Sequence, residues 1–328
     1  MQSLIFALNA VLPIIMMVVL GYFFKKVGIV KQDNAKILNK LVFRVFLPVM
    51  LFLNVYNIQM VSGIEYGYVL YAVVAVVMIF LISIPIIIAV TQNNEHRGAI
   101  LQSTFRSNYA LLGISLAEAL FGAEGAAVAT LLSAPLIPTL NILAVISLSI
   151  FKRNSQKICF KKIVLDVVKN PLIVGIFLGV VALCVRALFV KFGISFRLTD
   201  VEPVYKVLQY LSSVATPLAL LVLGIQFEVS AVSELKKEII IGVLIRTVAV
   251  PIFGLGIAYI FFKDYFTGAH FATFVAVFAT PVAVSSVPMA QEMDSDVALT
   301  GQLVIWTTVA SAISVFLASF ILKLIGVF

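Results

Sequence analysis

Long apolar segments, each followed by a short polar stretch, recur along almost the whole chain. A bilayer core of ~30 Å requires about 20 residues of helix, and the segments have about this length. The pattern predicts ten membrane spans, over residues 4–24, 37–56, 66–90, 97–121, 124–151, 164–190, 204–226, 237–262, 268–292 and 296–325. Transmembrane barrels instead show ~10-residue segments of alternating polarity, and this chain has none. We therefore expect an all-α polytopic membrane protein.

Two of the predicted spans are interrupted. Polar residues gather within seven positions of the fourth span: Gln102, Ser103, Thr104, Arg106, Ser107 and Asn108. In the ninth span, Pro281 and Pro288 each remove a backbone donor and obstruct the helical turn before them. Lipid offers such groups no partner, so they must face protein or a water-filled cavity. Interrupted spans in both halves of a chain point to the binding site of a transporter.

Ten spans divide into five and five around the basic segment 152–163, which we interpret as a cytoplasmic linker. Because five is odd, the second set starts from the opposite side of the membrane, so that the two sets, if they are repeats, are inverted. The predicted repeats occupy residues 1–151 and 164–328. Each carries a proline in its second span, at Pro48 and Pro217.

Composition and charge support a membrane protein and predict its orientation. Of 328 residues, 62% are hydrophobic and 12% charged, whereas soluble domains are about 45–50% apolar and about a quarter charged. Lys and Arg gather after spans 1 and 5, and the connections 57–65 and 122–124 have none. We therefore expect both termini outside the cytoplasm. The net charge of +8 reflects these loops and does not indicate nucleic-acid binding. The two cysteines have no metal-ligand spacing, and no metal site is expected.

An ordered set of motifs resembles the auxin efflux carrier family of membrane transporters, in its bacterial type. The principal motifs are Asn108-Tyr-Ala-Leu-Leu-Gly113-Ile, Ala279-Thr-Pro281 and Ala290-Gln-Glu292. Supporting motifs are Asn39-Lys-Leu-Val-Phe-Arg44, Leu47-Pro48, Lys169-Asn170-Pro171, Leu218-Ala-Leu220 and Leu223-Gly224. The resemblance covers essentially the whole chain, and the ordered set carries it because no single motif is specific.

The resemblance implies a fold like that of the bile acid sodium symporters, with two inverted five-helix repeats whose broken spans 4 and 9 cross. Spans 1, 2, 6 and 7 would form a scaffold domain, and spans 3–5 and 8–10 a transport domain. Family members carry organic anions, such as indole acetate in plants and malate or malonate in bacteria. The asparagine that matches Asn108 contacts substrate in plant members. Ser107 stands where plant carriers have proline, so we expect span 4 to unwind less sharply.

The candidate substrate-binding residues lie mainly in and around the two interruptions. They are Met50, Arg106, Ser107, Asn108, Tyr109, Asn141, Thr280, Pro281, Ser285 and Gln302, and the residues expected to shape the crossover are Asn108, Gly113, Pro281 and Pro288. A guanidinium suits a carboxylate, although Arg106 could equally pair with another group or reach toward water. A dicarboxylate would require a second cation, whereas a monocarboxylate with an apolar tail would use Met50 and Leu51. Arg44 and Arg246 have no obvious acidic neighbour and are interpreted as structural or interfacial.

The favoured function is a secondary transporter that moves a small organic anion by alternating access in the bacterial inner (plasma) membrane, with lipids around it. The chain has no nucleotide-binding loop and no expected cofactor, but Na⁺ stays open as a coupling ion and a homodimer as an assembly. The alternative is a sodium–proton antiporter or sodium-coupled symporter of the same architecture. An antiporter requires carboxylates at mid-membrane, and the centres of the predicted spans have none. Enzyme activity is not expected, since His96 and His270 fall in predicted loops without catalytic partners.

Overall fold

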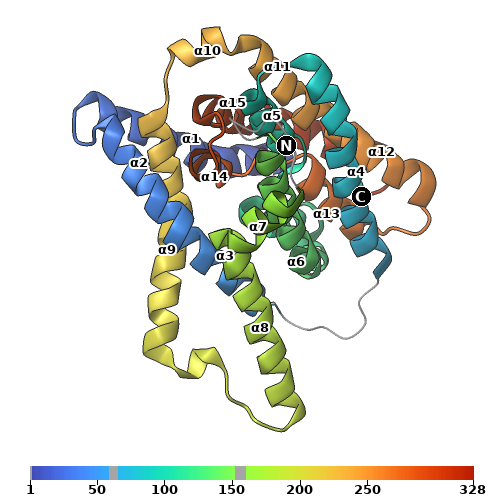
Figure 1. Ribbon diagram of the computed structural model, residues 1–328. Helices are drawn as coiled ribbons and strands as arrows, with labels where there is room; N and C mark the ends of the chain where they lie inside the picture. The colour runs from blue at the N-terminus through green and yellow to red at the C-terminus, as the bar shows by residue number, and fades with distance from the viewer. Residues whose placement is uncertain (1, 59–65, 152–159) are drawn as a thin grey trace.

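The computed structural model describes residues 2–58, 66–151 and 160–328, and all regular secondary structure in these ranges is helical (Figure 1). Residues 152–159 of the predicted linker lie outside the described ranges. The helices are α1 (Gln2–Lys26), α2 (Gln32–Leu41), α3 (Leu47–Tyr56), α4 (Tyr66–Val90), α5 (Asn94–Phe105), α6 (Tyr109–Ile150), α7 (Phe160–Lys169), α8 (Pro171–Lys191), α9 (Glu202–Gln226), α10 (Ser230–Glu234), α11 (Lys236–Leu244), α12 (Val250–Phe262), α13 (Gly268–Phe278), α14 (Ser286–Glu292) and α15 (Val297–Leu324). The π-helical segments η1 (Val42–Phe46) and η3 (Ile245–Ala249) join α2 to α3 and α11 to α12, and the 3₁₀ turn η2 (Leu198–Asp200) precedes α9.

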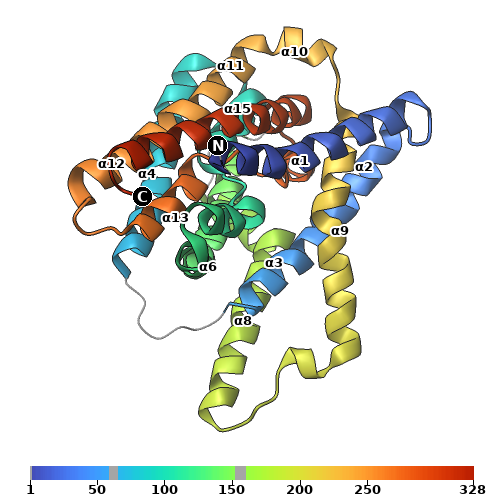
Figure 2. The same ribbon diagram turned by 180° about the vertical axis from the view of Figure 1, so that it is seen from behind.

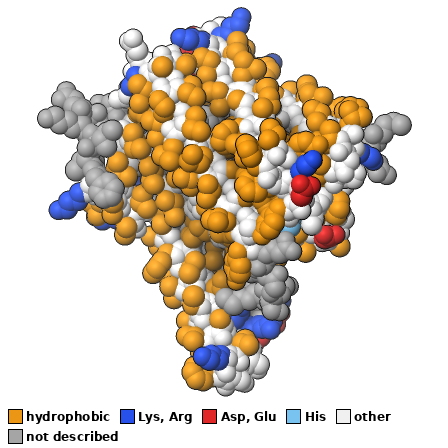
Figure 3. Space-filling model, turned by 90° about the vertical axis from the view of Figure 1, so that its right-hand side faces the viewer, with side chains coloured by type: hydrophobic (Ala, Val, Ile, Leu, Met, Phe, Trp, Pro, Cys, Tyr) orange, Lys and Arg blue, Asp and Glu red, His pale blue; other side chains and the backbone are white. Residues whose placement is uncertain are grey.

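Seven segments in the described ranges are long and apolar enough to cross a membrane. They are Gln32–Tyr56, Tyr66–Val90, Tyr109–Ile150, Pro171–Lys191, Glu202–Gln226, Lys236–Phe262 and Val297–Leu324. Hydrophobic side chains cover most of the face in Figure 3, with Lys and Arg mainly at its margins. Such a continuous apolar exterior suits lipid and not water. The structure therefore confirms a polytopic helical membrane protein.

Close helix packing joins α1 to α9 and α3 to α8 (Figures 1 and 2). A Cβ atom added at Gly21 of α1 would lie 2.1 Å from the carbonyl oxygen of Leu221, and one at Gly224 of α9 would lie 2.0 Å from that of Val18. At Gly175 of α8 the added atom would lie 2.5 Å from a carbonyl of α3. Glycine at these positions lets the backbones approach closely, as in many membrane helix pairs.

The sequence predicts a single span over 164–190, and the structure corrects its start. α7 ends at Lys169, and a new helix, α8, begins at Pro171. The Asn170 side chain accepts a hydrogen bond from the Leu172 amide at 3.0 Å and caps α8. Proline fits the first helical position and disfavours helical geometry in the residue before it, so this Asn-Pro pair separates the two helices.

Helix α6 contains a sharp corner at the predicted boundary between spans 4 and 5. Phe121 and Gly122 leave helical geometry, and Gly122 has a φ of 62°, which glycine adopts readily. The Tyr109 hydroxyl donates to the Ala129 carbonyl at 2.7 Å. In a straight helix residues that far apart would be separated by about 30 Å. The two halves of α6 therefore fold back and lie side by side.

Helix α13 lies at the centre of the molecule, where every residue from Ala269 to Phe278 is buried. It packs against α6 on one side and α12 on another. Aromatic rings fill this region, with Phe266, Phe271 and Phe278 around Phe274. The last turn of α13 is thereby held against α6, where the break of the ninth predicted span meets that of the fourth.

Candidate functional site

The two interrupted segments, 106–108 and 279–285, pair with each other through their backbones. The Asn108 amide donates to the Pro281 carbonyl at 2.8 Å, and the Ala283 amide donates to the Arg106 carbonyl at 3.1 Å. These bonds place Ser107 opposite Val282 in an antiparallel bridge. Unwound backbone inside a membrane protein must find its partners within the protein. Each broken segment therefore provides hydrogen-bond partners for backbone groups of the other segment.

Arg246, in η3, binds the carboxyl ends of two helices at this break. Its guanidinium donates to the Thr280 carbonyl from Nε at 2.9 Å and from Nη2 at 2.7 Å. It also donates to the carbonyls of Thr104 at 3.1 Å and Val277 at 3.0 Å. α5 and α13 end here, and helix carboxyl ends carry partial negative charge. The contacts of Arg246 are therefore structural, in line with its interpretation from the sequence.

Arg106 lies at the same break but has different partners. Its Nη2 donates to Asn141 Oδ1 at 2.9 Å and Ser285 Oγ at 3.0 Å, and its Nη1 to Met289 Sδ at 3.0 Å and Ser286 Oγ at 3.4 Å. The side chain is 2% exposed. Every one of these acceptors is neutral, and no carboxylate of the described residues forms an ion pair with Arg106. Its positive charge is buried without a counter-charge.

A small cavity opens beside Arg106. Its polar lining comes from Arg106, Ser107, Asn141 and Ser285, and the rest is mainly apolar: Leu47, Met50, Leu51, Ala110, Ile137, Leu140, Leu172 and Ala283. The space open to water-sized molecules is about 30 Å³, which suffices for about two waters. The Ser107 hydroxyl is buried and has no hydrogen-bond partner among the residues that the structure describes. Ala110 belongs to the first turn of α6, whose amino end adds partial positive charge.

The structure places five predicted substrate-binding residues at this cavity and the others elsewhere. Those at the cavity are Met50, Arg106, Ser107, Asn141 and Ser285. The Asn108 Nδ2 atom is buried beside the break, without an acceptor in the described part of the chain. Away from the cavity lining, the Tyr109 hydroxyl binds Ala129, Thr280 Oγ1 donates to Ala276, Pro281 accepts from Asn108, and the Gln302 amide donates to the Glu228 carbonyl at 3.0 Å. Of the remaining crossover candidates, Gly113 lies against the Tyr109 ring and Pro288 lies within α14.

Two residues around Arg106 are absent from the sequence-based set of binding candidates. Gln102, one helical turn before Arg106, donates from Nε2 to Met289 Sδ at 3.3 Å. Met289 therefore accepts hydrogen bonds from both Gln102 and Arg106. The polar cluster of the fourth predicted span does include Gln102, but nothing in the sequence distinguishes Met289 from a methionine that only fills space in an apolar helix.

The far end of α14 forms a polar contact with α2, η1 and α9, which we term the α14 latch (Asn39, Arg44, Gln226, Gln291 and Glu292). Gln291 Oε1 accepts from Asn39 at 2.9 Å and from Gln226 at 3.0 Å. Arg44 forms an ion pair of 2.9 Å with Glu292, which supplies the acidic neighbour that the sequence does not reveal. A helix of seven residues thus joins the surroundings of Arg106 to α2 and α9.

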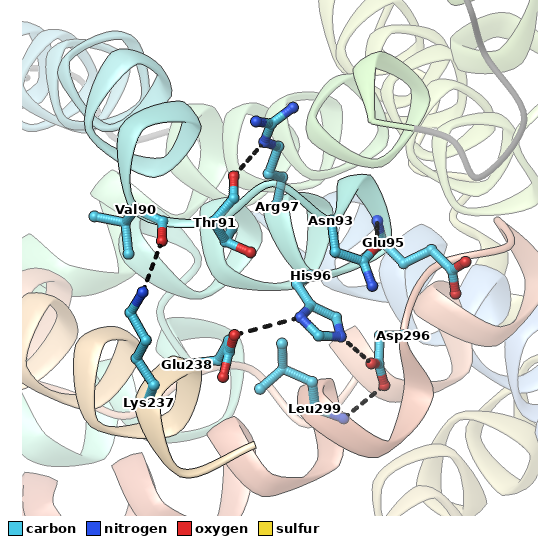
Figure 4. Close-up of polar contacts among 10 residues, drawn as sticks. All are labelled: Val90, Thr91, Asn93, Glu95, His96, Arg97, Lys237, Glu238, Asp296 and Leu299. Carbon is cyan, nitrogen blue, oxygen red and sulfur yellow. Dashed lines mark hydrogen bonds and ion pairs between the residues drawn. The ribbon is translucent and has the colours of Figure 1, made fainter. Parts of the chain in front are cut away.

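The prediction that both histidines fall in loops is wrong, because both lie in helices. Asn93 caps α5, so His96 lies in its first turn, between Glu238 of α11 at 3.6 Å and Asp296, the cap of α15, at 3.2 Å (Figure 4). His270 is buried in α13, and its Nδ1 accepts from the Thr267 amide at 3.0 Å. Both histidines therefore have structural partners at the starts of helices.

Comparison with known proteins agrees with this architecture. A family model described as "membrane transport protein" matches residues 6–158 and 152–319. An "uncharacterized transporter" of Methanothermobacter thermautotrophicus is 25% identical over 330 residues, which cover 96% of this chain and 98% of that protein. A second uncharacterized transporter, from Methanocaldococcus jannaschii, is 29% identical over 230 residues, which cover 68% of this chain and 70% of its own. Because the family matches extend along nearly the whole chain, this protein belongs to the membrane transport protein family, that of the auxin efflux carriers.

Proposed function

We propose that this protein is a secondary transporter that carries a small organic anion across the membrane by alternating access. The observation that carries the proposal is the buried guanidinium of Arg106, which contacts only neutral acceptors at the edge of a cavity. A buried charge without a partner is unfavourable by several kcal/mol. A carboxylate ligand would supply the missing counter-charge and a planar acceptor that matches the guanidinium.

The cavity lining favours a monocarboxylate with an apolar body. Arg106 is the single cation among the described residues that line the cavity, and most of the others are apolar. A dicarboxylate such as malate or malonate would place its second charge against side chains such as Leu140 and Met50, where no cation could bind it. An aromatic or aliphatic monocarboxylate would instead bury its apolar part there, at about 25 cal/mol per Å².

The proposed architecture is ten spans in two inverted repeats, with α5–α6 and α13–α14 as the crossing broken spans. Leu47 of α3 and Leu172 of α8 line one side of the cavity, and residues of α6 and of the two broken segments, 106–108 and 279–285, line the other. These two groups belong to the proposed scaffold and transport domains. Movement of one against the other would open the cavity, whose present volume is too small for an organic anion. The basic loops after spans 1 and 5 place both termini outside the cytoplasm in this proposal.

Gradients and membrane potential would drive transport. One charge that moves through 100 mV gains ~2.3 kcal/mol, which supports roughly fiftyfold accumulation. Sodium coupling and uniport differ in one observable: only the first makes the anion current depend on a sodium gradient.

The test is electrophysiology on solid-supported membranes with protein in liposomes. Benzoate, indole acetate, pyruvate, malate, malonate and succinate would each be applied with and without a sodium gradient. We expect currents with the apolar monocarboxylates that Arg106→Gln abolishes. Arg97→Gln is the matched control. It removes the same charge at the opposite end of α5, where Arg97 donates to the Thr91 carbonyl at 2.7 Å (Figure 4). The control should keep the currents.

Three other outcomes would contradict parts of the proposal. Currents with dicarboxylates alone would show that the inferred substrate class is wrong. Currents that survive Arg106→Gln would place the anion site elsewhere in the molecule. Silence with every anion, together with sodium-driven proton movement in the same liposomes, would replace the anion carrier by an antiporter.

A further inference from the structure

Two strong donors converge on one weak acceptor beside the proposed anion site. Arg106 Nη1 and Gln102 Nε2 lie 3.0 Å and 3.3 Å from the sulfur of Met289. A thioether is a weak hydrogen-bond acceptor, and a guanidinium is a charged donor. Gln102 is fully buried, and within the described ranges its Oε1 atom accepts no hydrogen bond. The hydrogen bonds that Arg106 Nη1 and Gln102 Nε2 make to this sulfur are therefore weak, and both donors could bind a stronger acceptor.

We propose that Met289 occupies, in the empty carrier, the place of a carboxylate oxygen of the transported anion, and that Gln102 is a further anion-binding residue. This inference rests on the proposed anion transport. A carboxylate oxygen is a charged acceptor that forms strong, often bidentate bonds with a guanidinium, whereas a thioether is a weak acceptor. The anion would therefore displace the sulfur from Nη1 of Arg106 and Nε2 of Gln102. Methionine suits this exchange because its unbranched side chain rotates about three bonds.

The displacement also links binding to the α14 latch. Met289 lies in the same short helix as Gln291 and Glu292, which contact α2, η1 and α9. When the anion releases Met289, α14 loses the contacts of that residue with Arg106 and Gln102, and keeps the Ser286 contact with Arg106 and those of the latch. The contacts that hold α14 are then mainly those with α2 and α9, and fewer are with α5. The hydrogen bonds that connect the two sides of the cavity are therefore different with the anion bound.

A pair of substitutions with opposite expected effects tests the exchange. Met289→Leu removes the acceptor at similar volume, so the anion has no competitor, and we expect the dissociation constant for benzoate to fall about three- to tenfold. Met289→Gln supplies a stronger acceptor and should raise that constant by about tenfold. Gln102→Leu should also raise it. Met78→Leu, on the exposed face of α4, is the control and should leave it unchanged. Isothermal titration calorimetry of the detergent-purified protein measures all four, with malonate as the second probe.

Methyl NMR reports the displacement directly. The chain has eight methionines, so ¹³C-methyl labelling gives few signals, and the Met289 signal is the one that Met289→Leu removes. Benzoate should shift the Met289 signal and leave that of Met16, exposed on α1, in place. If Met289→Leu does not fold, Met289→Gln gives the assignment.

The outcomes separate this inference from the proposed function. Benzoate binding with an unmoved Met289 signal would overturn the exchange and leave the anion carrier intact, as would changes of the same sign for Met289→Leu and Met289→Gln. If the wild-type protein binds neither benzoate nor malonate and carries none of the other anions tested, the proposed function itself fails and the inference fails with it.

Discussion

Replacement of Arg246 or Arg106 by glutamine should affect stability in different ways, although both side chains are fully buried at one break. Arg246 makes four hydrogen bonds to three backbone carbonyls. A glutamine amide could reach at most one of these carbonyls, which leaves two of them buried without a donor. At about 1–3 kcal/mol for each unsatisfied group, Arg246→Gln should lower the free energy of unfolding by roughly 2–6 kcal/mol.

Arg106→Gln removes a charge that has no counter-charge in the empty protein. Its partners are an amide, two hydroxyls and a thioether, and the amide and hydroxyls can rotate toward other groups. Hydrogen bonds from a charged donor are worth about 1.5–3 kcal/mol each, but glutamine can replace one of them, and removal of the unpaired buried charge offsets the rest by several kcal/mol. Arg106→Gln should therefore leave the stability unchanged or raise it, and abolish anion transport. Binding sites commonly lower stability in this way.

Thermal unfolding of both variants in one detergent, followed by circular dichroism, measures the contrast. Arg246→Lys is an intermediate control, since it keeps the positive charge but replaces the planar guanidinium, with its five N–H donors, by a compact ammonium group. The melting temperature should decrease from wild type to Arg246→Lys to Arg246→Gln. If Arg106→Gln melts as low as Arg246→Gln, Arg106 holds the fold together, and the argument for an anion site at its guanidinium is refuted.

Three further changes test the break, the packing and the latch. Ser107→Cys with Val282→Cys, without the native cysteines, should form a disulfide, because such antiparallel pairs hold Cα atoms ~4.5 Å apart; two free thiols by mass spectrometry would disprove the pairing. Gly224→Ala should lower the melting temperature, since its Cβ would lie 2.0 Å from a carbonyl of α1, whereas Gly256→Ala meets no atom within 4 Å and should be neutral or stabilising by about 0.5–1 kcal/mol. Gln291→Leu removes the acceptor shared by the amides of Asn39 and Gln226 and leaves Asn39 only Gln226 Oε1, so it should lower stability by about 1–2 kcal/mol; an unchanged unfolding curve in denaturant would show that the latch contributes nothing.

The apolar segments were predictable because the length and composition of a span are local properties of the chain. The predicted span 66–90 coincides with α4, and the predicted boundary near Phe121 coincides with the corner of α6. The interruptions around Arg106 and Pro281 were predictable for the same reason, since polar residues and proline disturb a helix wherever it packs. Three candidate residues found this way, Arg106, Ser107 and Ser285, line one cavity.

The partners of these residues were not predictable, because they depend on which distant segments meet. Glu292, the partner of Arg44, lies 248 positions further along the chain. Met289 and Arg106 are separated by 183 positions, and no local pattern relates them. The error at His96 was local: the cap at Asn93 starts α5 before the first apolar residue, so a boundary placed by hydropathy begins the helix too late.

The different partners of the two arginines explain why Arg106 can bind an anion and Arg246 cannot. The partners of Arg246 are backbone carbonyls at the ends of α5 and α13 and, at Thr280, just after α13, and they cannot turn away without a change in the backbone. The partners of Arg106 are side chains, and Met289, Ser285 and Ser286 can each turn away by a rotation about single bonds. An incoming carboxylate can therefore exchange with the partners of Arg106 while the ends of the broken helices stay neutralised by Arg246. Because the partners of Arg246 are fixed and those of Arg106 can be exchanged, an anion can enter and leave this break without disrupting the fold.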